Sequence, residues 1–392
     1  MLPAVARWRP SPAVLALALG VAIGRPGLRL VEPRLAQDGG LLEVLSQLAL
    51  LASLFCVGLR IQMPFSWSRW RIPTRLATLS MLATLILASA AAMLLFGVNF
   101  LEALLIAGIL APTDPVLGPE AVAEPQAAEA HSVEGSLNSA LALALIAVVL
   151  GLMGLETGAD GTTAAAPAWL ASRALWWLLG GAAIGWLIGL GMARWIALMD
   201  FDRQTARFET TLETIVVFAT SVLAFAGAEV LHAGGVPAVF VAAVALSHGG
   251  RFRAPVRRRP MGRRVLKIAG RVEKLAVLAS IVLLGVLSSE MDFRLKIVAF
   301  ALLLLGLIRP LAVRLGLADL QSAAPQRRSL EWAGIRGTAS LYGLVFAINH
   351  GVSGPFARQL AGIVLFVIAG SIVLHGAAAT PVQRASPGAL SS

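Results

Sequence analysis

Charged residues are scarce in this chain. They make up 14% of its 392 residues, whereas a soluble domain has about a quarter. The sequence also lacks any polar stretch long enough to form a second, water-soluble domain. Instead, 58% of the residues are apolar, and apolar runs of about twenty residues, the length that crosses a bilayer as a helix, recur along the chain. We therefore expect an all-α, polytopic membrane protein whose residues 1–392 form a single membrane domain.

Cysteine occurs once, as Cys56, inside an apolar run. A single cysteine excludes an intramolecular disulfide, and its setting favours an inert, buried thiol. The sequence shows no nucleotide-binding loop, no cluster of metal ligands and no nucleophile beside a base, so we expect neither an enzyme nor a cofactor. The histidines are scattered, mostly near the ends of apolar runs, where some could sense pH; they are His131, His232, His248, His350 and His375.

Hydropathy in a window of about twenty residues predicts about twelve membrane spans. They begin near Pro12, Leu41, Thr74, Phe100, Ser132, Ala168, Glu209, Val236, Arg271, Phe293, Leu330 and Arg358. The first is ambiguous, because two arginines before the apolar stretch Val14–Ile23 also fit the basic and apolar regions of a signal peptide. We favour a retained first helix.

Lysine and arginine are concentrated on one side of this expected topology. The densest basic segment, residues 251–267, predicts a cytoplasmic loop, and the other basic loops fall on the same side if both termini are cytoplasmic. The expected location is a cell inner membrane or plasma membrane, and residues 383–392 form a short polar tail. Because the net charge of +11 is mostly topological, it favours contact with anionic membrane lipid over binding of nucleic acid.

Two prolines interrupt the fourth apolar run, in the segment Pro112-Thr113-Asp114-Pro115. Proline removes a backbone donor, so the helix should unwind there and leave free carbonyl and amide groups at membrane depth. A cation could be coordinated by such groups. The alternative is an ordinary helix end, with Asp114 capping the helix that follows.

Polar residues also open the fifth run, EGSLNSALALALIAVVL, in which Glu134 and Asn138 share a helical face. Taken alone, this pattern also fits a polar helix start at the membrane interface. In the eleventh run, Arg336 lies among small residues that let another helix approach closely. An arginine inside a span needs a carboxylate partner, and either Glu134 or Asp114 is a candidate.

These segments, in this order, resemble the monovalent cation:proton antiporters, and in particular the prokaryotic sodium/proton exchangers. APTDPV is similar to the unwound fourth helix of that family, EGSLN to its Glu-x-x-x-Asn helix start, and AEVLHAGGVPAVFVAAVALSH to its glycine-rich central pair. LIRPLAVRL resembles its basic hairpin, GIRGTASLYGLVFAI its arginine-bearing broken helix, and SIVLHGAAATPV its final helix. The resemblance runs from about Leu41 to Val382.

The resemblance implies inverted repeats in which two discontinuous helices cross, with a monovalent cation and a proton bound beside the crossing. Carried over, the cation- and proton-binding residues would be Thr113, Asp114, Asn138 and Ser139. Asp114 would be the residue that contacts the metal ion, and Glu134 would form an ion pair with Arg336. The family resemblance also suggests a homodimer.

One residue departs from the family pattern. The core asparagine is followed in the family by an aspartate, whereas Asn138 is followed here by Ser139. A serine hydroxyl coordinates a cation but does not exchange a proton at physiological pH. The sequence therefore predicts a secondary antiporter in which Asp114 titrates, and leaves open an uncoupled cation pathway or a transport-inactive relative with a regulatory or scaffold role. If Asp114 does not titrate, Glu209, Glu213 and Glu229 are the next candidates.

Overall fold

The computed structural model describes residues 11–61, 66–117, 124–155, 167–198, 206–249, 263–320 and 324–382. In these ranges the chain is built from helices: α1 (Pro12–Ile23), α2 (Gly39–Arg60), α3 (Trp67–Arg75), α4 (Met81–Phe96), α5 (Phe100–Leu110), α7 (Pro125–Leu152), α8 (Pro167–Leu198), α9 (Ala206–Val230), α10 (Gly235–His248), α11 (Arg263–Val286), α12 (Leu295–Leu303), α13 (Arg309–Gly316), α14 (Ala324–Trp332), α15 (Thr338–Asn349) and α16 (Gly354–Val382). The segment 251–262 of the expected basic loop and the tail 383–392 lie outside the described residues.

The expected membrane spans are present as helices. Within the described ranges, eight helices are long and apolar enough to cross a membrane, where α3 and α4 count as one through a π-helical turn, as do α12 and α13. Four shorter apolar helices, α1, α5, α10 and α15, occupy the remaining positions of the expected order. The first apolar segment is among them, and α1 packs along α11.

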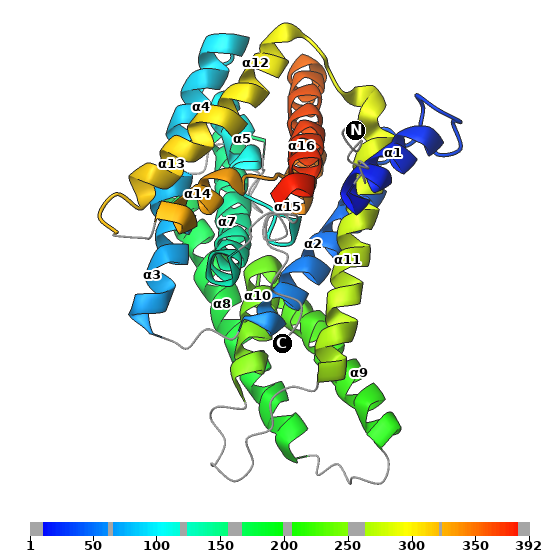
Figure 1. Cartoon of the computed structure of the whole chain (residues 1–392), viewed down its shortest axis with the longest axis vertical. Helices are drawn as coiled ribbons and strands as arrows, with labels where there is room; N and C mark the ends of the chain where they lie inside the picture. The colour runs from blue at the N-terminus through cyan, green and yellow to red at the C-terminus, as the bar shows by residue number, and fades with distance from the viewer. Residues whose placement is uncertain are drawn as a thin grey trace, which may run out of the picture.

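The helices pack as two groups. In one group, α10 lies against α8, α9 and α2, and α11 lies against α1 and α2. In the other, α5 contacts α4 and α7, while α13 contacts α4 and α14, and α15 contacts α16. Figure 1 shows α4 and α13 to the left of α7, α12 above it and α11 to its right. The main contacts between the groups are those of α15 with α2 and of α7 with α8.

Small residues let helices of the first group approach closely. A Cβ added at Gly185 of α8 would lie 2.1 Å from the Ala238 carbonyl oxygen of α10, and one at Gly189 would lie 2.4 Å from that of Ala242. Because lipid tails are as apolar as leucine, helices in a bilayer associate through such close backbone packing. Gly185 and Gly189, four residues apart, thus lie on one face of α8 and let it pack closely on α10.

Matching irregularities in the two halves of the chain fit the expected repeats. The third span contains the π-helical turn Leu76–Ser80, and the tenth contains the π-helical turn Leu304–Ile308. The fourth span is interrupted after α5, and the eleventh is interrupted between α14 and α15. The third and tenth spans are as far apart in the order of spans as the fourth and eleventh, as expected of repeated units.

Candidate functional site

The two interrupted spans meet, although more than two hundred residues separate them. The amide nitrogen of Asp114, in the unwound segment after α5, donates a 2.8 Å hydrogen bond to the Ile335 carbonyl oxygen in the segment before α15. α5 begins with a capping box, in which Asn99 and Glu102 each accept from the other's amide at 3.0 Å. It ends at Leu110, two residues before the first of the two prolines. The expected meeting of PTDP with GIRGTAS is confirmed.

The Asp114 carboxylate is buried and fully hydrogen-bonded. Its Oδ1 accepts from the amide nitrogens of Val116 at 2.9 Å and Leu117 at 2.8 Å. Its Oδ2 accepts from the amide of Thr338 at 3.1 Å and from the Thr338 hydroxyl at 3.3 Å. Two acceptor positions on each oxygen are thereby filled. Asp114 thus holds the turn that follows it and also occupies the N-terminus of α15, where the helix dipole favours a negative charge.

Arg336 binds the C-terminus of a helix, whereas Asp114 binds an N-terminus. Its Nη1 donates to the carbonyl oxygens of Ala111 at 3.1 Å and Pro112 at 3.3 Å, just past the C-terminus of α5. In a continuous helix these carbonyls would accept from residues 115 and 116. Pro115 has no amide hydrogen, and the amide of Val116 is taken by Asp114. The guanidinium therefore satisfies carbonyls that the proline break leaves free, at the negative end of the helix dipole.

Two glycines allow the segments of the crossing to touch. A Cβ at Gly337 would lie 2.0 Å from Asp114 Oδ2, and a Cβ at Gly135 of α7 would lie 2.8 Å from the Thr113 carbonyl oxygen. Any larger residue at either position would displace the unwound segments. α7 consequently lies directly against the PTDP segment and brings Glu134 and Asn138 to it.

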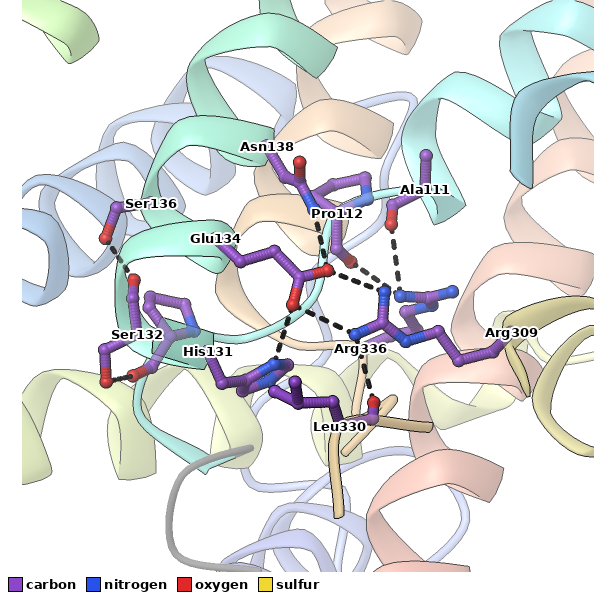
Figure 2. Close-up of polar contacts among 11 residues, drawn as sticks. Ala111, Pro112, His131, Ser132, Glu134, Ser136, Asn138, Arg309, Leu330 and Arg336 are labelled. Carbon is purple, nitrogen blue, oxygen red and sulfur yellow. Dashed lines mark hydrogen bonds and ion pairs between the residues drawn. The ribbon is translucent and has the colours of Figure 1, made fainter. Parts of the chain in front are cut away.

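Glu134 has a different partner from the one predicted. Both of its carboxylate oxygens accept from Arg309 at the start of α13, at 2.6 Å from Nη1 and 3.0 Å from Nη2 (Figure 2). Within the described residues, Arg336 forms no ion pair, and its hydrogen bonds go to backbone carbonyls instead. The predicted Glu134–Arg336 pair is therefore wrong. A bidentate, fork-like geometry makes the Arg309 pair both strong and directional.

The sequence carries a signal at Arg309 beyond its resemblance to a basic hairpin. Arg309 interrupts an apolar stretch and precedes Pro310 in LIRPLAVRL. The π-helical turn Leu304–Ile308 ends directly before it, and such turns occur often at functional sites. A buried arginine in a span needs a carboxylate as much as Arg336 does. The sequence therefore offers two arginines as partners of Glu134. The packing of α13 on the core makes Arg309 the partner.

His131 completes the charged cluster around Glu134. Its Nδ1 lies 3.0 Å from Glu134 Oε2, and both side chains are fully buried. Figure 2 shows the imidazole below the glutamate, on the same side as the backbone of Leu330. Nε2 of His131 has no hydrogen-bond partner among the described residues. The sequence predicted only that this histidine is one of several near span ends.

The neutral polar residues of the predicted site lie beside the crossing and are buried. Asn138 Nδ2 donates to Glu134 Oε1 at 3.4 Å, while its Oδ1 has no partner in the described part of the chain. The Thr113 hydroxyl is likewise without a partner there. Ser139 donates its hydroxyl hydrogen to the Gly135 carbonyl at 2.7 Å, which leaves oxygen lone pairs available. These three oxygens are neutral acceptors in a region crowded with charge.

The last helix, α16, contacts both sides of the interruption in the eleventh span. Ser371 of α16 accepts a 3.0 Å hydrogen bond from the amide of Arg336, and His375 Nε2 lies 2.8 Å from the Trp332 carbonyl oxygen. Serine and histidine one turn apart thereby hold both ends of the unwound segment 333–337. The resemblance of SIVLHGAAATPV to the final helix of an exchanger pointed to this helix, but not to its contacts.

Two cavities flank the crossing along α7. One, of about 430 Å³, is lined by Arg60, Pro115, Val116, Ala128, Ser132 and Glu273, among others. It therefore reaches the turn after Asp114, whose amides donate to the Asp114 carboxylate. In its wall Arg60 forms an ion pair with the buried Glu273 of α11. The other, of about 300 Å³, is lined by residues of the second half of α7 and by Arg173, Glu229, His232 and His350. The helix that carries Glu134 and Asn138 thus lies between two openings.

Nearly the whole chain matches one family model. The family model described as sodium/hydrogen exchanger, transmembrane, matches residues 2–385. The chain therefore belongs to the sodium/hydrogen exchanger family, a class of multi-pass membrane transporters, and that family indicates a sodium/proton antiporter.

Solved structures agree with this assignment at the level of the fold. The sodium proton antiporter MjNhaP1 from Methanocaldococcus jannaschii, solved at pH 8, is 18% identical to the chain with a TM-score of 0.69, and the match covers 94% of this chain and 92% of that one. An electron-microscopy structure of the same antiporter is 19% identical with a TM-score of 0.73, covering 95% and 88%. At such low identity, the likeness shows the fold alone.

Proposed function

We propose that the protein is a secondary active transporter that exchanges a monovalent cation, sodium or potassium, for protons by alternating access. The observation that carries the proposal is the crossing of two interrupted helices beside buried oxygens that lack a partner in the described chain, those of Thr113 and Asn138. Unwound backbone at membrane depth is tolerated where it lines a site or is buried in protein, and discontinuous helices bind substrate in many transporters. Membership of the exchanger family supports the same activity.

The cation would be bound by oxygens that approach from two elements. Thr113 and Asp114 belong to the unwound segment, while Asn138 and Ser139 belong to α7, whose Gly135 lies against that segment. Hard monovalent cations prefer such carbonyl, hydroxyl and carboxylate oxygens. Because the Asp114 oxygens already accept four hydrogen bonds, direct coordination by this carboxylate would require one of those donors to withdraw.

A second candidate function follows from the same residues. Ser139 cannot take up a proton, and Asp114 is held by four donors, which favours an uncoupled cation pathway or a transport-inactive relative. Only a measurement of proton movement separates these functions from exchange.

The test is proton movement driven by a cation gradient in proteoliposomes, with sodium, potassium and lithium compared in turn. We expect an imposed gradient of the preferred cation to move protons in the opposite direction, and Asn138→Ala to abolish the movement. The matched control is Asn349→Ala, because Asn349 is an exposed asparagine that binds Glu43 away from the crossing. Cation movement without proton movement would establish the uncoupled pathway, and absence of both would establish the inactive relative.

The setting proposed for this activity is a cell inner membrane or plasma membrane, with both termini cytoplasmic and the protein a homodimer in contact with membrane lipid. The lysine and arginine distribution supports the orientation. Cross-linking in native membranes, combined with labelling of engineered cysteines from each side, tests the dimer and the orientation.

A further inference from the structure

We propose that His131 binds and releases the exchanged proton at its Nε2, and that this proton competes with the cation through charge rather than through shared ligands. The inference rests on the proposed exchange function and identifies the residue that replaces the missing aspartate as proton carrier.

The tautomer of His131 follows from its partner. Glu134 accepts two hydrogen bonds from the Arg309 guanidinium, so it is ionised and acts only as an acceptor. The Nδ1 atom of His131, 3.0 Å from Glu134 Oε2, must therefore carry a hydrogen and donate it. In neutral imidazole the other nitrogen is then a bare acceptor. Nε2 of His131 is that nitrogen, buried and without a partner in the described chain.

The two core carboxylates offer no comparable position. Asp114 accepts four hydrogen bonds. Glu134 accepts two from Arg309, one from His131 and one from Asn138. Protonating either carboxylate would turn an acceptor into a donor that faces other donors, and a buried donor left unsatisfied costs about 1–3 kcal/mol. Adding a proton to Nε2 breaks no existing hydrogen bond, so its cost is only that of one new buried N–H donor, which has no acceptor in the described chain.

Charge balance makes the proton and the cation exclusive. The buried groups at the crossing are Asp114 and Glu134, each negative, and Arg309 and Arg336, each positive, so their sum is neutral. A proton on His131 or a cation beside Asn138 adds one positive charge, and both together add two. In a site of low effective dielectric, two uncompensated positive charges repel strongly. The transporter can therefore hold one or the other.

The neighbours of His131 do not offset this charge. Besides Glu134 on its own helix, its charged surroundings are Arg309 of α13, which binds the same glutamate, and His375 of α16. The buried carboxylate on α14, Glu331, is itself paired with Arg314. Glu134 is thus the one anion in direct contact with His131 in the described chain, and it is already neutralised by Arg309.

A cavity adjoins the stretch of α7 that carries His131, and His131 itself is fully buried beside it. The cavity of about 430 Å³ is lined by Ala128 and Ser132, which flank His131 on that helix. A proton from water that reaches Nε2 from this cavity would form the new bond there, and the hydrogen on Nδ1 would stay in its hydrogen bond to Glu134. When a cation enters, the Nε2–H bond breaks and the proton returns to water. No other bond changes.

Calorimetry of cation binding in buffers of different ionisation enthalpy tests the assignment, because it counts the protons released per cation bound. We expect about one proton per cation in the wild type near neutral pH and close to none in His131→Gln, which keeps a donor to Glu134 but cannot titrate. The matched control is His248→Gln, a buried histidine at the end of α10, which should release as many protons as the wild type. Ser139→Asp in the His131→Gln background should restore proton release.

Each outcome separates the two proposals. Cation binding without proton release in the wild type would overturn the exchange function itself. Undiminished release from His131→Gln would overturn the role of His131 while leaving exchange intact. Should His131→Gln fail to fold, infrared difference spectra of the wild type decide: cation addition should remove imidazolium bands that shift with isotope-labelled histidine. Loss of a protonated-carboxyl band instead would show that a carboxylate carries the proton.

Discussion

Asp114 and Arg336 occupy reciprocal positions at the crossing. Asp114, from the break after α5, accepts hydrogen bonds from Thr338 at the N-terminus of α15. Arg336, from the break before α15, donates hydrogen bonds to Ala111 and Pro112 at the C-terminus of α5. Each broken helix thus supplies the charge that the end of the other requires. The crossing is stable because the two breaks complete one another, although Asp114 and Arg336 form no pair within the described structure.

The first prediction concerns Glu134 and Arg309. Removing one member of a buried ion pair leaves the other charge uncompensated, so Glu134→Gln and Arg309→Gln should each lower the free energy of unfolding by about 3–5 kcal/mol. The double variant should lose less than the sum of the two. Thermal unfolding in detergent measures all three.

The control is a double-mutant cycle of Glu134 and Arg336, the pair expected from the sequence. Because Arg336 binds backbone carbonyls instead, the coupling energy between Glu134→Gln and Arg336→Gln should be smaller than that between Glu134→Gln and Arg309→Gln. A large coupling energy in this cycle, with none between Glu134 and Arg309, would contradict the observed pairing.

The spans and their interruptions could be predicted from the sequence because they depend on hydropathy and on proline, which act locally. The partner of Glu134 could not, since Arg309 and Arg336 both lie in apolar surroundings and their reach depends on how α13 and α15 are rotated about their axes. That the Asp114 carboxylate accepts four hydrogen bonds could not be predicted from the sequence either. It requires the N-terminus of α15, a distant element, although the sequence did raise helix capping as an alternative role for Asp114.

The second prediction uses the close approach at Gly337. A Cβ there would lie 2.0 Å from Asp114 Oδ2, so Gly337→Ala should break the bonds between Asp114 and Thr338 and abolish transport. The measurement pairs thermal stability with proton flux. Gly270→Ala is the control, because a Cβ at this α11 position meets nothing within 4 Å, and alanine there should be neutral or stabilising by up to about 1 kcal/mol. Equal behaviour of the two variants would argue against the crossing.

The third prediction concerns Asp114→Asn. One carboxylate oxygen becomes an amide nitrogen, which faces hydrogen-bond donors on either side of the residue. At least one end of the crossing loses its acceptor, so proton flux should disappear and thermal stability should fall. Unchanged flux in Asp114→Asn would show that this carboxylate is needed neither for exchange nor for the crossing.

The fourth prediction concerns the cavity of about 430 Å³ beside the Asp114 turn. In a Cys56→Ala background, Ala128→Cys should react with a membrane-impermeant thiol reagent from one side only, because Ala128 lines this cavity. Ala107→Cys should stay unreactive, since Ala107 is fully buried in α5. The reactive side also fixes the orientation, and labelling from the cytoplasmic side is expected. Protection of Ala128→Cys from both sides would mean that the cavity is closed to water.

The fifth prediction addresses the serine at the family's aspartate position. Ser139 is fully buried and donates to the Gly135 carbonyl at 2.7 Å. Aspartate there adds one negative charge to a cluster whose formal charges otherwise cancel, so Ser139→Asp should bind the cation more tightly and hold the exchanged proton more firmly. Flux in proteoliposomes should be at least equal to that of the wild type, with its optimum moved to higher pH. Ser139→Asn has nearly the same size without the charge and should show neither gain; if it matches Ser139→Asp, volume rather than charge limits transport at this position.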